Sequence, residues 1–471
     1  MRTKAYLLPF LCLLAGCSGR DGGTEACEAF DPWETGGEGA DVSAPPPSGE
    51  ARAGRIASEE DVPHGAKSQS EVGDFVMRNG RVLFVVEEPG VSDGYQPFGG
   101  GIVHADLVGT DGEPLGLSLF GESFHGIALA LVDPESVSVI ADGSDGSEAV
   151  VRVVGPMRNM PLLDVAFGFF FESNHGATYI LDYALGPDSE YLELRLHVRN
   201  ANTGWAYVNL FIFGSVQGDG LALFTPEGGF DTDALSGSHD LFGHVGDEIS
   251  YAWMDAEGGS LRYVMEESGI VVGDKGATVQ MEGCSETTVP LIRLLVAPGG
   301  AEALLAAVRR AAGEDEPPGT TFAVSVDGGG DSSDALVHVT REDGSYVTTA
   351  RSVSGTWSAG IPEGAYLATG ILAGHPPVRD IPFTVDAVGA SVDVTIPEAA
   401  TVTYTVTDGS GPIPAKILFV PADPPEPLPA CFGIRSLPDG AYAYMFDPDG
   451  AASIPLPPGG YTAIATRGYE Y

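Results

Sequence analysis

The chain has 471 residues, 43% of them hydrophobic, and its 23 Lys and Arg against 66 Asp and Glu give a formal net charge of −43. This length exceeds one ordinary hydrophobic core and predicts about two to four domains, while the apolar content excludes general disorder. Because so acidic a field repels nucleic acid, the composition argues against a nucleic acid partner and indicates a solvated extracytoplasmic surface, with calcium-binding loops as the alternative.

The first 17 residues, MRTKAYLLPFLCLLAGC, have the layout of a secretory signal peptide. Arg2 and Lys4 precede an apolar run that is too short to span a bilayer as a stable helix. The run ends in Leu-Ala-Gly-Cys, which resembles the bacterial lipobox, and this resemblance implies that Cys17 is lipidated and becomes the mature N-terminus. Ser18 rather than Asp follows, so the resemblance also implies an outer membrane lipoprotein that faces the periplasm or the cell surface. An ordinary signal peptide with an incidental Cys is the alternative.

Residues 18–65 are rich in Gly, Glu, Asp, Ser and Pro, a composition that predicts a flexible acidic tether between the lipid and the folded body. Three cysteines remain after processing, namely Cys27, Cys284 and Cys431. This odd number allows one disulfide in an oxidising compartment, leaves its pairing open, and implies no disulfide framework.

Residues 66–298 show strands and turns with almost no helical period. Asn79-Gly80 separates two apolar runs and predicts a hairpin with a type I′ turn. The glycine triplet at 99–101 lacks the helix and the Lys or Ser/Thr of a phosphate-binding loop and therefore predicts a turn. In YLELRLHVRN, residues 191–200, apolar and charged side chains alternate, as is typical of a half-buried antiparallel strand. Dense apolar runs at 166–173 and 207–216 are expected to be central strands between two packed sheets.

Residues 299–319 hold the one stretch with helical spacing. Apolar side chains at 301, 304, 305, 308 and 312 fall on one helical face, and Gly313 suits the end of the helix. Two prolines in the following GEDEPPG segment cannot continue it, so a linker is expected there.

The chain then repeats itself, since IPEGAY at 361–366 matches LPPGGY at 456–461. This repeat predicts two small β-sandwich modules at residues 320–398 and 399–471. In each module a tyrosine, Tyr366 or Tyr461, is expected to bury its ring against the sheet and to donate its hydroxyl proton to the backbone.

These parts resemble known families. The modules resemble carboxypeptidase-regulatory-like, prealbumin-type sandwiches. Residues 66–298, with GDFVMRNGRVLFVVEEPG and YLELRLHVRNANTG, resemble the galactose-mutarotase-like supersandwich. Lipobox, acidic tether, supersandwich, helix and modules in this order are similar to the front half of CehA/McbA-type metallohydrolase lipoproteins. In those proteins a PHP-type metal-dependent hydrolase domain follows, so the resemblance implies a catalytic domain beyond Tyr471.

The metal ligands of that hydrolase domain have no counterpart in this sequence. A PHP domain opens with two histidines separated by one residue, and no two of the nine histidines here have that spacing. The resemblance therefore transfers no catalytic and no metal-binding residue. Enzyme activity stays open, and a metallohydrolase is expected only if a PHP domain follows.

Other groups of polar residues could carry chemistry. Mutarotase-like enzymes use a His and a Glu on a sugar ring, so ligand-binding candidates are His125 with Glu122 and His175 with Glu172. The segment from Ser238 to Glu248 gathers histidines and carboxylates that could bind zinc, although a solvated loop is favoured. Acidic turns such as ADGSDGSE at 141–148 are candidate calcium loops without the EF-hand order.

The sequence thus predicts a mainly β protein: a large antiparallel β-supersandwich, one short helix, and two small Ig-like or prealbumin-like sandwich modules. The expected function is a lipid-anchored extracytoplasmic scaffold or binding protein with a glycan or protein ligand, without nucleic acid and without a required cofactor. A carbohydrate-active or carbohydrate-binding supersandwich is the first alternative, and a surface adhesion lipoprotein is the second.

Overall fold

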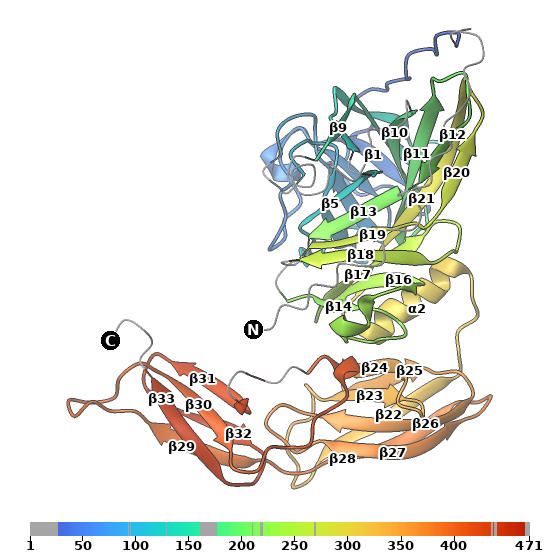
Figure 1. Cartoon of the computed structure of the whole chain (residues 1–471). Coiled ribbons are helices and arrows are strands. Elements are labelled where there is room, and N and C mark those ends of the chain that lie inside the picture. The colour runs from blue at the N-terminus through green and yellow to red at the C-terminus, as the bar shows by residue number, and fades with distance from the viewer. Residues whose placement is uncertain are drawn as a thin grey trace.

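The structure is a computed structural model that describes residues 27–466 except 93, 95, 129, 161–176, 210, 217–219, 268–269, 435–436 and 438–439. It is mainly β, with a large two-sheet domain at one end, two small modules at the other, and one α-helix between them among the described residues (Figure 1). The predicted fold class is confirmed. No helix in these described ranges is long and apolar enough to cross a membrane.

The large domain consists of two sheets and a short ribbon. The first sheet has the strand order β1 (Arg52–Arg55), β2 (Phe75–Arg78), β3 (Val82–Val86), β4 (Ile102–Leu107), β5 (Glu122–Ile127), β13 (Phe211–Val216), β19 (Ile270–Asp274), β18 (Leu261–Glu267), β15 (Ser238–His239). Two short strands branch from it: β6 (Ala130–Val132) pairs with β5, and β9 (Met157–Asn159) pairs with β6. The second sheet has the order β14 (Ala222–Phe224), β16 (Leu241–Val245), β17 (Ile249–Asp255), β21 (Ser285–Pro298), β11 (Tyr191–Asn200), β10 (Ala177–Leu185), β8 (Ala149–Val154), β7 (Ser136–Asp142). The ribbon pairs β12 (Ala206–Asn209) with β20 (Thr278–Met281).

The inward faces of the two sheets form one continuous hydrophobic core. Strand β11 shows how the sequence builds it, because its residues alternate between half-buried and fully buried along the whole strand. Leu192, Leu194 and Leu196 are 0% exposed, and each such side chain contributes about 1.5–3 kcal/mol relative to an exposed position. The predicted half-buried strand at 191–200 is therefore confirmed. The expected strand at 207–216 forms as β12 and β13, while the run at 166–173 lies outside the described residues.

The hairpin predicted at Asn79-Gly80 joins β2 to β3, but its turn differs from the predicted type I′ turn. Gly80 does not have a positive φ, which a type I′ turn requires. Instead the Asn79 side chain accepts hydrogen bonds from the backbone N–H groups of Arg81 (2.8 Å) and Val82 (3.0 Å). The side-chain amide therefore closes the turn, a role for which Asn is well suited.

Residues 27–65 do not form the flexible tether predicted for 18–65. Strand β1 lies within this segment and pairs with β2, and Gly37 forms a bridge with Val139 of the second sheet. The guanidinium of Arg199 lies 3.2 Å from the ring centroid of Trp33. These contacts bury apolar side chains that the Gly- and Pro-rich composition conceals, so the large domain begins well before residue 66.

Helix α2 (Ala301–Ala312) confirms the predicted helix and ends at Gly313, which has φ of 71°. It packs on β17 and β21 of the large domain and on β24 (Tyr346–Val353) of the first module, and so lies between them (Figure 1). Its Glu302 accepts hydrogen bonds from Thr348 Oγ1 (2.6 Å) and Gly360 N (2.8 Å) of that module. The buried side of the helix belongs to a separate hydrophobic cluster that joins residues of the large domain to Tyr346 of the first module.

The first module is a seven-stranded sheet folded on itself, and the second has a two-stranded and a three-stranded sheet. In chain order the strands are β22 (Gly319–Val326), β23 (Leu336–Thr340), β24 (Tyr346–Val353), β25 (Thr356–Gly360), β26 (Gly364–Ile371), β27 (Val378–Val385), β28 (Ala390–Ile396), β29 (Ala400–Thr405), β30 (Ala415–Pro421), β31 (Ala443–Asp447), β32 (Ala451–Leu456) and β33 (Tyr461–Thr466). Pairing is antiparallel throughout these strands except between β22 and β28.

The repeated tyrosine has the same role in both modules, as expected. Tyr366 donates its hydroxyl proton to the carbonyl oxygen of Pro362 at 2.9 Å. Tyr461 does the same to Pro457 at 2.8 Å. Each bond spans four residues and fastens the start of a strand to the preceding proline turn. Tyr366 is 1% exposed, whereas Tyr461 is only half-buried, because the second module has the smaller core.

Candidate functional site

The structure separates the predicted pair Glu122 and His125. Both lie on β5, but three residues apart, so the period of two places their side chains on opposite faces of the sheet. His125 faces the core between the two sheets, where its ring lies 6.1 Å from that of Tyr183 and 5.6 Å from that of Trp253. His175 and Glu172 lie outside the described residues.

His125 is a core residue rather than a surface acid or base. It is 2% exposed, and burial lowers the pKa of its imidazole to about 3, so the ring is neutral at physiological pH. Within the described part of the chain, its two ring nitrogens and the indole N–H of Trp253 have no hydrogen-bond partner. The idea that His125 acts on a sugar ring in an open cleft receives no support from this position.

Glu122 instead belongs to a group of carboxyls, here termed the acidic cluster, which consists of the buried Asp74 and Glu122 and the half-buried Glu87. Cross-strand pairing at one end of the first sheet brings them together. Phe75, next to Asp74, pairs with Val86, next to Glu87. Val86 also pairs with Ile102, which in turn pairs with Ser123, next to Glu122. Asp74 is 2% exposed and Glu122 is 3% exposed. Carboxyls this buried are rare unless the protein uses or neutralises them.

Burial raises the pKa of two members of the acidic cluster. The pKa of Asp74 is raised to about 6, mainly by burial, although its carboxylate accepts backbone hydrogen bonds from Glu88 (2.9 Å) and Glu71 (2.8 Å). The pKa of Glu87 is raised to about 7 by burial and by the nearby charges of Asp74 and Glu122. The cluster thus exchanges protons close to neutral pH, which suits general acid–base chemistry or binding to hydroxyl groups.

Described residues of the segment between β3 and β4 contact the acidic cluster, since the backbone N–H of Gln96 donates a hydrogen bond to Glu122. In the glycine triplet, Gly99 lies against the backbone of Glu88, Gly100 against Val153 of β8, and Gly101 against the backbone of Ser123 of β5. A Cβ on Gly99 would lie 1.9 Å from the carbonyl oxygen of Glu88, and one on Gly94 would lie 2.2 Å from the Glu122 carboxylate. Gly94 therefore permits a close approach to the Glu122 carboxylate, whereas the triplet permits close packing against backbone and the Val153 side chain.

A second polar network lies on the outer face of the second sheet. Asp182 accepts two hydrogen bonds from Arg152 and one from His197, each at 2.7 Å. The other nitrogen of His197 lies 3.0 Å from Thr288 Oγ1. Burial tends to raise the pKa of Asp182, but these hydrogen bonds and charges lower it overall. Because the bidentate Arg152 already neutralises Asp182, we interpret this network as a structural cross-link between strands.

The segment from Ser238 to Glu248 is not the solvated loop that was favoured. His239 lies on β15 and His244 on β16, and they are 7% and 2% exposed. Leu241, Phe242 and Val245 draw the segment into the interior, where all five residues of β16 are buried. No group of three or more His, Cys, Asp or Glu suited to a metal ion occurs among the described residues.

The acidic turns are closed by their own side chains. In the predicted calcium loop at 141–148, Asp142 accepts a hydrogen bond from the backbone of Ser144 and Asp145 one from that of Ser147, both at 2.9 Å. Asp331 and Asp343 form the same contact with the residue two positions later. These are Asx turns, in which each carboxylate has a local structural role.

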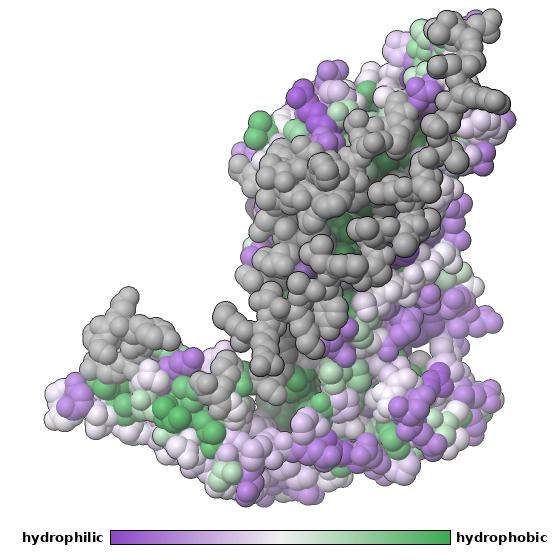
Figure 2. Space-filling model, in the orientation of Figure 1, coloured by the Kyte–Doolittle hydropathy of each residue, from purple (hydrophilic) through white to green (hydrophobic). Residues whose placement is uncertain are grey.

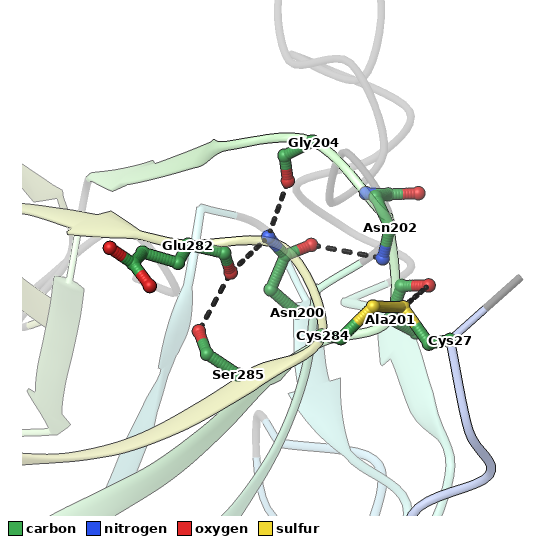
Figure 3. The surroundings of a disulfide bond; sticks show 8 residues. All are labelled: Cys27, Asn200, Ala201, Asn202, Gly204, Glu282, Cys284 and Ser285. Carbon is green, nitrogen blue, oxygen red and sulfur yellow. Dashed lines mark hydrogen bonds between the residues drawn. A yellow bond between two sulfur atoms is a disulfide. The ribbon is translucent and has the colours of Figure 1, made fainter. Parts of the chain in front are cut away.

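A disulfide joins Cys27 to Cys284, and Figure 3 shows it between the N-terminal segment and the turn that leads into β21. The backbone N–H of Cys284 donates to the carbonyl oxygen of Asn202 at 2.9 Å. Cys431 is a free, half-buried thiol. The sequence left this pairing open, because the two cysteines are 257 residues apart and no spacing rule connects them.

No family model and no curated protein matches this chain. Among solved structures, the Bacillus anthracis TIE protein shares 13% identity over 64% of this chain and 54% of its own, with a TM-score of 0.17. A TPR-domain protein from Parabacteroides distasonis shares 9% identity over 50% of this chain and 51% of its own, with a TM-score of 0.31. The galactosidase domain of alpha-galactosidase–sucrose kinase shares 9% identity over 54% of this chain and 45% of its own, with a TM-score of 0.27. The chain thus spans about half the length of these proteins, and we base no functional argument on them.

Proposed function

We propose that this chain is an exported, lipid-anchored β-sandwich scaffold that acts outside the cytoplasm through binding or presentation. The observation that carries the proposal is the disulfide between Cys27 and Cys284. Such bonds persist in oxidising compartments and are rare in the cytosol. The disulfide lies just after a leader that ends at Cys17 in a lipobox-like sequence. Both features favour export, and the lipobox favours acylation of Cys17 and an outer membrane location.

The two modules support a presenting role. They lie at the end of the molecule away from β12 and β20 (Figure 1). The disulfide holds the N-terminal segment at the other end, next to these two strands. Their buried polar groups, such as His338 and Thr349, bond to each other rather than to an open site. In this proposal the chain corresponds to the front part of a CehA/McbA-type lipoprotein, and any metal-dependent hydrolase domain is a separate unit that it positions.

The test is acylation of the full chain in a bacterial host. Cells are fed an alkyne fatty acid, and the protein is then recovered from separated inner and outer membranes. Label on the wild-type protein and its loss in Cys17→Ser support the proposal, whereas Cys12→Ser is the matched control and keeps the label. A wild-type protein that is unlabelled and found in the soluble fraction refutes the anchor.

The acidic cluster favours a second candidate function, which is carbohydrate binding at its end of the first sheet. Carboxyls that are buried, close together and raised in pKa can accept hydrogen bonds from sugar hydroxyls. Glycan-array binding of the purified chain, followed by calorimetry on Glu122→Gln, tests this function. A glycan that binds the wild type and the Glu122→Gln variant equally well would place its site elsewhere.

A further inference from the structure

Two large aromatic side chains project into solvent from the β12–β20 ribbon. Trp205 is 57% exposed and Tyr207 is 58% exposed. The residues that alternate with them, Ala206 and Val208, are buried. The ribbon therefore has one apolar face in the core and a second face on which both aromatic side chains are more than half exposed.

This aromatic face adjoins the disulfide. The Asn200 side-chain amide donates to the carbonyl oxygens of Gly204 and Glu282, both at 2.9 Å, and so ties together the two chain segments that carry the face (Figure 3). The backbone N–H of Cys284 donates a hydrogen bond to the carbonyl oxygen of Asn202. The Cα atoms of the disulfide partners Cys27 and Cys284 are 5.3 Å apart. Trp205 directly follows Gly204, so the aromatic face and the covalent fastening of the N-terminal segment belong to one end of the domain.

The disulfide also sets the distance from this end to the lipid. Nine residues, 18–26, separate Cys17 from Cys27. Fully extended, the ten Cα-to-Cα steps span at most about 35 Å. The 48-residue tether expected from the sequence would reach on the order of 160 Å. An acylated Cys17 would therefore hold the aromatic face within one domain diameter of the bilayer surface.

The cross-strand neighbours of the aromatic face are uncharged. Gln280 lies opposite Tyr207 on β20 and Thr278 lies opposite Asn209, and the turn 201–204 is Ala-Asn-Thr-Gly. Exposed carboxylates at this end lie closer to the disulfide, at Glu28, Glu282 and Glu286, and the last of these pairs with Arg199 at 2.7 Å. Trp and Tyr are the side chains that favour the headgroup region of a bilayer, and low charge lets them approach it.

We propose that the exposed face of the β12–β20 ribbon, centred on Trp205 and Tyr207, rests on the bilayer surface beside the lipid anchor. This inference rests on the proposed function, because the anchor supplies the local concentration that makes a small contact effective. The contact fixes the orientation of the large domain, so that helix α2 and both modules point away from the membrane.

The first test measures depth of insertion. The acylated chain is reconstituted in vesicles of phosphatidylethanolamine and phosphatidylglycerol whose acyl chains carry bromine, which quenches nearby tryptophan. Trp253 and Trp357 are buried, and the half-buried Trp33 is present in both proteins, so the difference between wild type and Trp205→Phe isolates Trp205. We expect a quenched component that Trp205→Phe lacks. Equal fractional quenching of the two proteins refutes the contact.

A second test does not depend on Cys17. The chain from residue 18, with an N-terminal His tag, is held on the same vesicles by nickel-chelating lipid. We expect the same quenched component of tryptophan emission, and its absence in this experiment refutes the membrane contact. Missing acylation of the full chain, in contrast, refutes only the lipid anchor. Without any tether, Trp205→Ala/Tyr207→Ala should lower vesicle partitioning about tenfold, as expected from the lost apolar burial.

The matched control is Tyr444→Ala/Phe446→Ala, which removes aromatic side chains that are 54% and 72% exposed on the second module. This variant should partition like the wild type, and an equal loss would indicate general stickiness and refute the specific face. Two results obtained without vesicles would also refute the membrane contact. These are dimerisation of the chain, or a shift of tryptophan emission on addition of soluble oligosaccharide, if Trp205→Phe abolishes the effect. Either would show that another molecule occupies the aromatic face.

Discussion

Replacing Glu87 by Gln should stabilise the protein at alkaline pH. Burial and neighbouring carboxylates raise the pKa of Glu87 from 4.5 to about 7. The folded state therefore binds more protons than the unfolded state between these two pKa values. The stability that this group contributes is fully present below pH 4.5 and is lost as the pH rises to 7. A shift of roughly 2.5 pKa units corresponds to at most roughly 3 kcal/mol, and Glu87→Gln removes this loss while keeping the shape of the side chain.

Hydrogen exchange of the β2–β4 amides between pH 5 and pH 8, corrected for intrinsic rates, measures the local free energy of opening. The wild type should lose about 2–3 kcal/mol over this interval, and Glu87→Gln should lose clearly less. Glu88→Gln is the matched control, because Glu88 is adjacent but half-exposed and pairs with Arg55 at 2.8 Å, so its removal changes stability by no more than about 1 kcal/mol. If the Gln variant at position 87 were no more stable than the wild type at pH 8, the acidic cluster would not be a group of destabilised carboxyls.

Three further predictions concern the fold. Tyr366→Phe should lower the free energy of unfolding of the first module by about 1–2 kcal/mol, because it removes a buried hydrogen bond. Tyr461→Phe should lower that of the second module by less, because the Tyr461 hydrogen bond is closer to solvent. Thermal unfolding measures both variants, and equal effects would contradict the reasoning. Cys27→Ser should increase hydrogen exchange in residues 27–56 while β11 stays protected, and unchanged exchange would show that noncovalent contacts suffice. Leu304→Ala, in the core shared by the large domain and helix α2, should cost about 2–5 kcal/mol and loosen both bodies in limited proteolysis; loosening of only one would separate them.

The sequence predicted those features that depend on local patterns. Period-two alternation predicted β11, one helical face predicted α2, and a repeated proline-glycine-tyrosine motif predicted the bonds of Tyr366 and Tyr461. Each signal lies within a few residues along the chain and reports directly on which face is buried.

The features that the sequence did not predict depend on contacts between distant segments. The packing of residues 27–65 depends on partners in both sheets, and Cys27 pairs with a cysteine 257 residues later in the chain. Glu122 was selected, but its neighbours Asp74 and Glu87 were missed, since only strand pairing brings the three together. The Glu-Glu-Pro-Gly end of β3 was the available signal, because acidic residues directly after a buried strand are unusual.

The surface contains one further clue to how the chain meets its surroundings. Figure 2 shows hydrophobic surface gathered over the second module, where the outer face of the three-stranded sheet includes Tyr444, Phe446 and Ile464. The Lys416 ammonium lies 5.0 Å from the ring centroid of Tyr444 on this face. This second exposed apolar face is what makes Tyr444→Ala/Phe446→Ala a demanding control for general hydrophobic adsorption in the vesicle assay.

Helix α2 has a mechanical consequence. Because Glu302 bonds to two strands of the first module while the opposite side of the helix packs on β17 and β21, the joint cannot rotate without opening a hydrophobic interface. Tension applied to the modules is therefore transmitted through a stiff coupling instead of being absorbed by an elastic linker. A single-molecule pulling record should show no soft extension before the first unfolding step.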